Sequence, residues 1–506
     1  MRYLSVLTVA PLVGAVVVAS LPRSRPTLAK QVALVWSLAV LALTAAMWIA
    51  FDRGGERLQF RESYQWIPHW GVRLTFAVDG IALVMLALIA VLVPLVILAS
   101  WHDAEGGRRS VPAYFALLLA LQSTMIGVFS AADVFLFYVF FEVMLVPMYF
   151  LIGSYGGNQR QYAAVKFFLY SLVGGLFMLA AVIGLWVVGG HTFDWVSLTK
   201  IDMSTWVERW LFLGFFVAFA VKAPFFPFHT WLPDAGGAAP AGAAALLVGV
   251  LDKVGTFGIL RYCLPLFPNA SRYFAPLVLT LALVGIVYAA LLAVGQNDLK
   301  RLVSYTSIAH FGFIGVGIFA FTSQAGTGAV LYMVNHGLAT GLLFLVVGML
   351  VARRGSALIS DFGGAGKLLP LLAGVFLFAG LASLALPGLA PFVSEFLVLL
   401  GTFTVNKTVA VIATGGIILA AAYVLWMIQR TTQGTLNPAL SDVDKMRRDL
   451  NVREVAVVAP LIALLLVLGF YPKPVLDVIN PAVSATLQDV GATDPAPTAN
   501  HQEAGK

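Results

Sequence analysis

The chain has a single cysteine, Cys263, among its 506 residues. One cysteine cannot form a disulfide within the chain. Iron–sulfur clusters generally take four cysteine ligands, so this chain cannot hold such a cluster by itself. The sequence also lacks a glycine-rich phosphate loop, a dinucleotide-binding fingerprint and a paired-histidine zinc motif. The chain is therefore expected to hold no cofactor and no metal of its own.

Charged residues are scarce as well. They make up 11% of the chain, whereas hydrophobic residues make up 60%. Soluble domains have about 25% charged and about 45–50% apolar residues, so this composition indicates a protein that crosses a membrane many times. The net charge of +7 does not indicate nucleic-acid binding, because no basic stripe with interleaved aromatic residues is present.

Long apolar stretches account for most of the sequence. A membrane-spanning helix needs about 20 mostly apolar residues, and about fourteen stretches meet this requirement. They are 3–21, 31–51, 77–100, 112–130, 132–153, 163–189, 205–223, 239–262, 273–295, 301–322, 327–351, 369–400, 406–429 and 454–471. The sequence therefore predicts an all-α polytopic membrane protein of about fourteen transmembrane helices.

Lysine and arginine are concentrated in the loops that follow odd-numbered helices, although the connection 52–76 is also rich in arginine. By the positive-inside rule these loops are cytoplasmic, and both termini lie on the outer side. We expect the segments 1–111 (three N-terminal helices), 112–262 (first half-channel), 263–430 (second half-channel), 431–482 (cytoplasmic connection and last helix) and 483–506. The last segment is polar and contains proline and glycine, so it is predicted to be disordered.

Two of the apolar stretches are interrupted by prolines next to an ionisable residue. Lys222 stands just before Pro224, and Glu395 follows Pro391. The tripeptide Ala-Pro-Phe occurs at both places. Inverted repeats with discontinuous helices at corresponding positions are common in transporters. The pattern predicts two inverted five-helix repeats, helices 4–8 and 9–13, with broken helices 7 and 12.

Glu142 and Lys222 are the first ionisable groups expected at membrane depth. Such groups are costly in a bilayer and usually face a protein interior or a water-filled path. One interpretation is a structural ion pair that joins two helices. The other is a proton switch, because a buried lysine keeps its proton beside a carboxylate and releases it when the carboxylate is distant. Lysine suits this role better than arginine, which stays protonated.

Further ionisable residues follow in the later helices. Lys253 is either a relay group or a side chain that extends to the interface. Its neighbour Asp252 points about 100° away on a helix, and it either takes part in the series or only faces a wet cavity. His310 and His336 are either hydrogen-bonded core residues or proton relays. Glu395 ends the series in the second broken helix.

Lys166 lies one turn inside helix six and has two interpretations. It is either a solvated helix end or a group that modulates Glu142 or Lys222 from the cytoplasmic side.

The chain resembles the antiporter-like proton-pumping subunits of respiratory complex I, the NADH–quinone oxidoreductase. The segments that carry this resemblance are 132–152, 166–170, 221–235 and 298–310. In that family a glutamate on helix five, a lysine on broken helix seven, a central lysine on helix eight, histidines on helices ten and eleven, and an ionisable group on broken helix twelve carry protons. These roles fall here on Glu142, Lys222, Lys253, His310, His336 and Glu395. The final group is typically Lys in subunits L and N and Glu in subunit M, so Glu395 favours the M type.

The resemblance implies an enzyme subunit that moves protons while electron transfer takes place elsewhere. FMN, iron–sulfur clusters and quinone are then expected in partner subunits, and the sister subunits L and N are expected partners in a bacterial cell membrane. The alternative is a subunit of a multisubunit cation/proton antiporter or of a related membrane-bound hydrogenase complex. One departure is Gly236-Gly237, where the family usually has polar residues.

Overall fold

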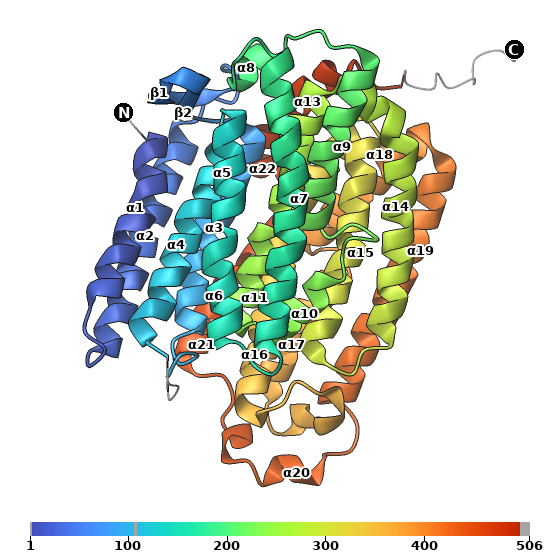
Figure 1. Ribbon diagram of the computed structural model, residues 1–506. Coiled ribbons are helices and arrows are strands. Elements are labelled where there is room, and N and C mark those ends of the chain that lie inside the picture. The colour runs from blue at the N-terminus through green and yellow to red at the C-terminus, as the bar shows by residue number, and fades with distance from the viewer. Residues whose placement is uncertain (1–2, 106–108, 496–506) are drawn as a thin grey trace, which may run out of the picture.

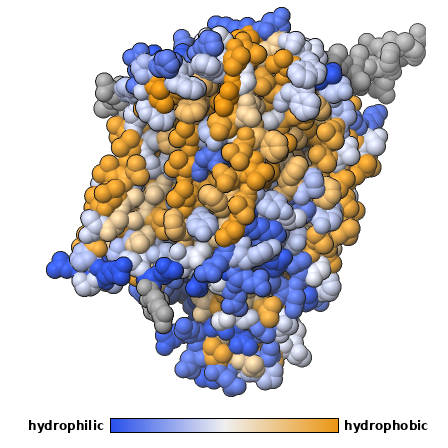
Figure 2. Space-filling view, viewed as in Figure 1, coloured by the Kyte–Doolittle hydropathy of each residue, from blue (hydrophilic) through white to orange (hydrophobic). Residues whose placement is uncertain are grey.

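The computed structural model describes residues 3–105 and 109–495, which form a bundle of long, roughly aligned helices (Figure 1). In the described residues, twelve helices are long and apolar enough to cross a membrane, and two shorter apolar helices, Pro370–Ser383 and Ala390–Val405, accompany them. Figure 2 shows a broad apolar band across the visible face of the bundle, with polar side chains at both ends. The chain is therefore an all-helical, multi-pass membrane protein apart from one short hairpin.

The first part of the chain contains eight helices, several of which start at a capping side chain. They are α1 (Tyr3–Ser20), α2 (Pro26–Ala50), α3 (Gly80–Ala99), α4 (Val111–Ser130), α5 (Val134–Val143), α6 (Leu145–Tyr155), α7 (Arg160–Val188) and α8 (Trp195–Leu198). Asp79, Ser110 and Asp133 each accept a hydrogen bond from the amide three residues further on. These caps satisfy amides that have no partner inside the helix.

A β-hairpin lies in the arginine-rich connection that follows α2. Strands β1 (Gln59–Ile67) and β2 (Val72–Val78) pair antiparallel and are joined by the short helix η1 (Pro68–Trp70). The hairpin lies at one end of the bundle, which we call the hairpin end, and α20 marks the other, the α20 end (Figure 1).

The first break interrupts the helix that follows α8. Its parts are α9 (Thr205–Lys222) and α10 (Trp231–Ala238). The next span comprises α11 (Ala241–Leu246), η2 (Leu247–Leu251), α12 (Lys253–Gly258), η3 (Ile259–Cys263) and α13 (Leu264–Leu266), of which η2 and η3 are π-helical. This span continues past the half-channel boundary predicted at 262, and its most apolar window is 100% buried, compared with 28% for α2. It is therefore the central helix of the bundle.

The second part contains the other break. Its elements are α14 (Pro268–Val294), α15 (Leu299–Phe319), α16 (Ser323–Arg354), η4 (Ile359–Asp361), η5 (Ala365–Lys367), α17 (Pro370–Ser383), α18 (Ala390–Val405), α19 (Lys407–Thr432), α20 (Pro438–Ser441), η6 (Asp444–Arg447), α21 (Val452–Phe470) and α22 (Lys473–Val490). The stretch 369–400, which is continuous in hydropathy, is divided at 384–389 between α17 and α18.

The prediction that 483–506 is disordered is wrong for its first residues. Helix α22 continues to Val490, and Val483, Leu487 and Val490 on its apolar face are buried. This amphipathic face packs on α3, α13 and α16, which supplies the burial that a polar, proline-containing composition does not indicate. Residues 496–506 lie outside the described part of the chain.

Candidate functional site

Ionisable side chains lie inside the bundle, on several helices around its central span. Lys222, Asp252 and Lys253 have no exposed surface, Glu395 is 5% exposed, and Glu142 is half-buried. The two histidines, His310 and His336, are buried as well. In a bilayer such residues mark ion or proton paths more often than packing.

Glu142 lies at the end of α5 against a neighbouring helix. Its carboxylate occupies the space beside Gly175 on α7, where a Cβ atom would overlap Glu142 Oε1. That oxygen has no hydrogen-bond partner among the described residues. Glycine at 175 therefore lets the carboxylate enter the space between α5 and α7.

Lys222 is the last residue of α9 and has aromatic rings as its near neighbours. Its Nζ lies 4.7 Å from the Phe141 ring centroid and 5.8 Å from that of Phe167. Lys222 Nζ has no hydrogen-bond partner, and none of the ion pairs formed within 4.0 Å by the described residues joins it to Glu142. Glu142 is nevertheless the charged group with the largest electrostatic effect on Lys222. The two groups are near neighbours without a direct bridge.

The break after Lys222 leaves backbone groups without hydrogen-bond partners in the helix, and a side chain donates to one of them. Residues between Lys222 and Trp231 are not in a regular helix. Trp231 Nε1 donates to the Val221 carbonyl at 2.9 Å. A helix end needs such partners at membrane depth, where water is scarce. The break therefore positions Lys222 at a helix end inside the bundle.

Lys253 is held at the end of a π-helical turn. The amide of Asp252 donates to the carbonyl of Leu247, five residues earlier, instead of to Val248 as in an α-helix. Lys253 Nζ donates to that Val248 carbonyl and lies 2.7 Å from His336 Nδ1. The π turn thus makes a backbone acceptor available to the ammonium, and π-helical turns are frequent at functional sites. The side chain does not extend to the interface.

The two histidines connect Lys253 with the second half of the chain. His336 Nε2 lies 3.1 Å from Ser307 Oγ, and the rings of His336 and His310 have centroids 5.3 Å apart. His310 Nδ1 lies 2.6 Å from Tyr332 Oη. Sequence reasoning missed Ser307 and Tyr332, because a hydroxyl in an apolar helix carries no local motif.

Glu395 is buried in the first turns of α18. Asn335 on α16 donates from Nδ2 to the Ala390 carbonyl at 2.7 Å and to Ser394 Oγ at 3.3 Å, which fastens the start of α18. Glu395 acts electrostatically on Tyr332 and Tyr423, so these phenols are among its neighbours. Tyr332 thus contacts His310 and is electrostatically coupled to Glu395.

Lys166 is tied to the second half of the first broken helix. Its Nζ donates to Asp234 Oδ2 at 2.6 Å, and Arg301 donates to Asp234 Oδ1 at 2.5 Å. Asp234 and Arg301 line a polar cavity of about 530 Å³ towards the α20 end, together with Asp298 and Lys300. Lys166 is thus paired with a carboxylate that lines this cavity.

The departure at Gly236-Gly237 has a packing reason. A Cβ atom at 236 would overlap Ser304 Oγ, and one at 237 would lie 3.0 Å from Arg301 Cγ. Helix α10 therefore packs closely on α15 at these two glycines, and a side chain at 236 would require Ser304 to move.

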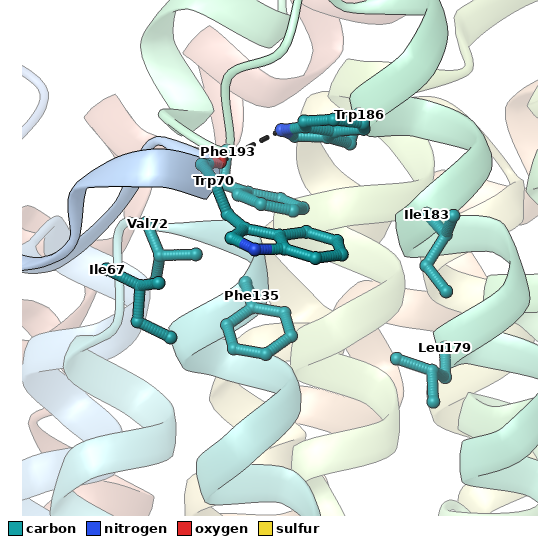
Figure 3. A pocket seen from close by; sticks show the side chains of 8 residues that line it. All are labelled: Ile67, Trp70, Val72, Phe135, Leu179, Ile183, Trp186 and Phe193. Atoms are coloured by element: carbon teal, nitrogen blue, oxygen red, sulfur yellow. Dashed lines mark hydrogen bonds between the residues drawn. The ribbon is translucent and has the colours of Figure 1, made fainter.

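A second cavity, of about 260 Å³, is apolar and lies at the hairpin end (Figure 3). Trp70, Phe135, Ile183 and Trp186 are among its lining residues, and Trp186 Nε1 donates to the Trp70 carbonyl at 3.0 Å. No ionisable residue lines it. Among residues 3–105 and 109–495, no three His, Cys, Asp or Glu side chains gather as a metal-binding group. The buried ammonium, imidazole and phenol groups that contact one another can exchange protons.

The chain is similar to known proteins over most of its length. The family described as NADH:quinone oxidoreductase/Mrp antiporter, TM, matches residues 131–420. NADH-quinone oxidoreductase subunit M of Mycobacterium tuberculosis is 49% identical, over 99% of this chain and 96% of the relative.

Two solved structures are also similar. A chain of respiratory complex I from Thermus thermophilus has a TM-score of 0.87 and 31% identity, covering 97% of this chain and 100% of that chain. A chain of the Mrp complex from Dietzia sp. DQ12-45-1b has a TM-score of 0.84 at 21% identity, covering 97% and 100%, which shows a shared fold. The match over residues 131–420 and the 49% identity along almost the whole chain show that it belongs to the NADH:quinone oxidoreductase/Mrp antiporter transmembrane family.

Proposed function

We propose that this chain is a proton-translocating subunit in the membrane arm of an NADH–quinone oxidoreductase. The observation that carries the proposal is the series of buried ionisable groups from Glu142 and Lys222, through Lys253 and the two histidines, to Glu395. Relatives along the full chain are NADH-quinone oxidoreductase subunits M, and a complex I chain has a similar structure. The chain is thus part of an oxidoreductase and moves protons while other subunits reduce quinone.

In this proposal Glu142 sets the charge of Lys222, Lys253 is the central relay, and Glu395 is the terminal group. His336 and His310 pass a proton between Lys253 and Tyr332, whose hydroxyl leads to Glu395. Water molecules complete the steps for which no direct hydrogen bond is present. Lys166 adjusts the first half from the α20 end through Asp234.

The two half-channels are related as inverted repeats in this proposal, and matched contacts at Asp133 and Asp298 support this. Each aspartate caps a helix, α5 or α15, and each forms an antiparallel bridge with the loop after the next long helix, at Asp194 or Leu358. Glu142 and Ser307 stand the same number of residues after the capping aspartate. In this proposal the chain has fourteen transmembrane helices, made up of the twelve long spans and the two broken helices.

The partners proposed for the chain are the sister subunits L and N in a bacterial cell membrane, with FMN, iron–sulfur clusters and quinone in other subunits of the complex. The hairpin end faces outward and the α20 end faces the cytoplasm. The buried Cys263 is the one cysteine available, so a cluster with four cysteine ligands would have to lie elsewhere.

A second candidate function, a subunit of a cation/proton antiporter, is favoured by the structural likeness to the Mrp complex. A related membrane-bound hydrogenase complex belongs to the same alternative. These functions require no NADH oxidation, whereas a complex I subunit moves protons only as part of a redox enzyme.

The experiment is to purify the assembly through a tag on this chain and to reconstitute it in vesicles. We expect flavin and iron–sulfur subunits to copurify, and NADH-driven proton uptake to fall several-fold in Lys253→Ala and Glu395→Gln. Glu395→Lys is expected to retain part of the activity, because sister subunits carry lysine there. Cation-driven exchange without NADH activity would reject the proposal in favour of the antiporter.

A further inference from the structure

Asp252 is a buried carboxylate to which the proposed series assigns no role. It has no exposed surface, and neither of its oxygens has a hydrogen-bond partner among the described residues. Burying a charge without a partner costs several kcal/mol or more. A side chain in this position needs a charged neighbour to balance it.

The helix face that carries Asp252 is directed at the end of α9. Asp252 and Gly255 are three residues apart and share a face of the central helix. A Cβ atom at Gly255 would lie 2.5 Å from the Phe219 carbonyl oxygen and 2.6 Å from the amide nitrogen of Ala223. These two atoms flank Lys222, so the face of Asp252 packs on the turn that presents this lysine.

Lys253 points away from that face. Its ammonium contacts the Val248 carbonyl and His336 on α16, and it lies 5.2 Å from the Phe311 ring centroid. Adjacent helical residues diverge by about 100°, so Asp252 faces the first half of the chain and Lys253 the second.

The charged groups that act on Lys222 and on Lys253 also differ between the two halves of the chain. Glu142 and Asp252 act on Lys222, whereas Asp252 is the charged group that acts on Lys253. Lys222 and Lys253 are in turn the two charged groups that act on Asp252. Asp252 is thus the carboxylate that both lysines share.

We propose that Asp252 is a positioning residue, a shared counter-ion that couples the protonation of Lys222 to that of Lys253. One buried carboxylate compensates one ammonium. When Glu142 is ionised, each lysine has a carboxylate and both hold a proton. When Glu142 takes up a proton, Asp252 alone must balance both ammonium groups, so Lys253 gives a proton to the imidazole of His336, 2.7 Å away. The neutral amine that this leaves on Lys253 can then accept the proton of Lys222. This inference rests on the proposed function and adds the link between its two halves.

The test compares Asp252→Asn with Asp252→Glu in the complete complex reconstituted in vesicles. We expect Asn to lower NADH-driven proton uptake and quinone reduction several-fold per assembled complex, and Glu to retain more than half of both. Wild-type values in Asp252→Asn would overturn the inference. If that variant does not assemble, Asp252→Ser provides the same comparison.

The matched control is Glu208→Gln, which removes a buried carboxylate with a structural role. Glu208 is 3% exposed, and its Oε1 accepts the Asn269 and Ala270 amides at 2.7 and 3.0 Å. This variant should reduce the amount of complex and leave proton uptake per assembled complex unchanged.

Non-additivity separates coupling from a general loss of packing. If Asp252 acts through the lysines, Asp252→Asn should add little to the defect of Lys222→Ala. Additive defects would overturn the inference. Failure of Glu142→Gln to change proton uptake would instead contradict the proposed function itself, so the two failures can be distinguished.

Discussion

Lys222 and Lys253 are both fully buried, yet their ammonium groups have different partners. Lys253 has a backbone carbonyl and an imidazole within hydrogen-bond distance, whereas Lys222 lies over two aromatic rings and has no hydrogen-bond partner in the described chain. A cation–π contact contributes about 0.5–2 kcal/mol, much less than the cost of burying an unpaired charge. The charge on Lys222 therefore depends on carboxylates nearby, which is the property a proton switch requires.

Glu142→Gln is expected to lower NADH-driven proton uptake several-fold while the complex still assembles. Glutamine fills the same space beside Gly175 but cannot compensate the charge of Lys222. Proton uptake and NADH–quinone activity in membranes with a known amount of assembled complex measure the effect. Near-normal values for both would make Glu142 a bystander.

Lys222→Arg is expected to restore little of the activity lost in Lys222→Ala. Arginine keeps the positive charge beside Phe141 and Phe167 but does not release a proton at accessible pH. The measurement is proton uptake per NADH oxidised in the two variants. Full activity in Lys222→Arg would show that the site supplies a constant charge only.

Tyr332→Phe is expected to slow proton uptake several-fold without changing the amount of complex. The substitution removes the hydroxyl that lies 2.6 Å from His310 Nδ1 and keeps the ring that packs against Phe313. Tyr423→Phe is the comparison variant, because Tyr423 also neighbours Glu395 but has no hydrogen bond to either histidine. Equal effects of the two variants would assign no special role to Tyr332.

At the scale of elements, apolar length and proline predicted the helices that cross the bundle, but not how polar segments fold. The hairpin Gln59–Val78 lies in a connection between two apolar helices. Apolar and polar residues alternate there over only a short stretch, and many of these residues are half-exposed. Helix α22 has apolar residues at helical spacing, among them Val483, Leu487 and Val490, a periodicity in the sequence that the polar composition of the tail obscured. The π-helical turns beside Asp252 depend on tertiary packing, because no residue type requires an i→i+5 bond.

The candidate site was also predictable in part: the positions of its charged residues could be found from the sequence, whereas their contacts could not. A charge inside an apolar stretch is readable from sequence, which is how Glu142, Lys253 and Glu395 could be proposed. Which carboxylate faces which lysine depends on the rotation of each helix, and a serine or tyrosine in a helix has no signature. Ser307, Tyr332 and the orientation of Asp252 were therefore accessible only from the structure.

A buried ion pair joins α16 to α21, and a variant that breaks it is expected to lose stability. Arg353 NH1 and NH2 donate to the two carboxylate oxygens of Glu454 at 2.8 and 2.6 Å, and both side chains are 9% exposed. Removing one partner of a buried pair typically costs about 3–5 kcal/mol. Glu454→Gln should therefore lower the thermal stability and the amount of the complex.

The same pair distinguishes structural from proton-carrying charges. In Glu454→Gln we expect unchanged proton uptake per assembled complex, because the pair also fastens the backbone through Arg353 Nε and the Arg448 carbonyl at 2.8 Å. The double variant Arg353→Met with Glu454→Leu should recover part of the stability, since no charge is then left unpaired. A lowered proton yield in Glu454→Gln would place this pair in the proton path.

At the scale of the whole molecule, the two ends of the bundle differ in charge and architecture. The hairpin, α8 and the N-terminal start of α1 lie at one end, and the loop with α20 extends from the other (Figure 1). Counted by transmembrane helices from the N-terminus, the loops after odd-numbered helices are rich in lysine and arginine, and they lie at the α20 end. The positive-inside rule predicts that this end faces the cytoplasm. In the proposed orientation, the polar cavity around Asp234 and Arg301 lies in the cytoplasmic half of the bundle.

The orientation can be measured because the only native cysteine, Cys263, is fully buried. Glu56 at the hairpin end and Asp444 near α20 are both exposed carboxylates, so Glu56→Cys and Asp444→Cys form a matched pair. We expect a membrane-impermeant maleimide to label Glu56→Cys in intact spheroplasts and Asp444→Cys in inverted vesicles, with the unsubstituted chain as the unlabelled control. The reverse pattern would invert the topology, and the proton path would then have to be drawn with its cavity on the outer side.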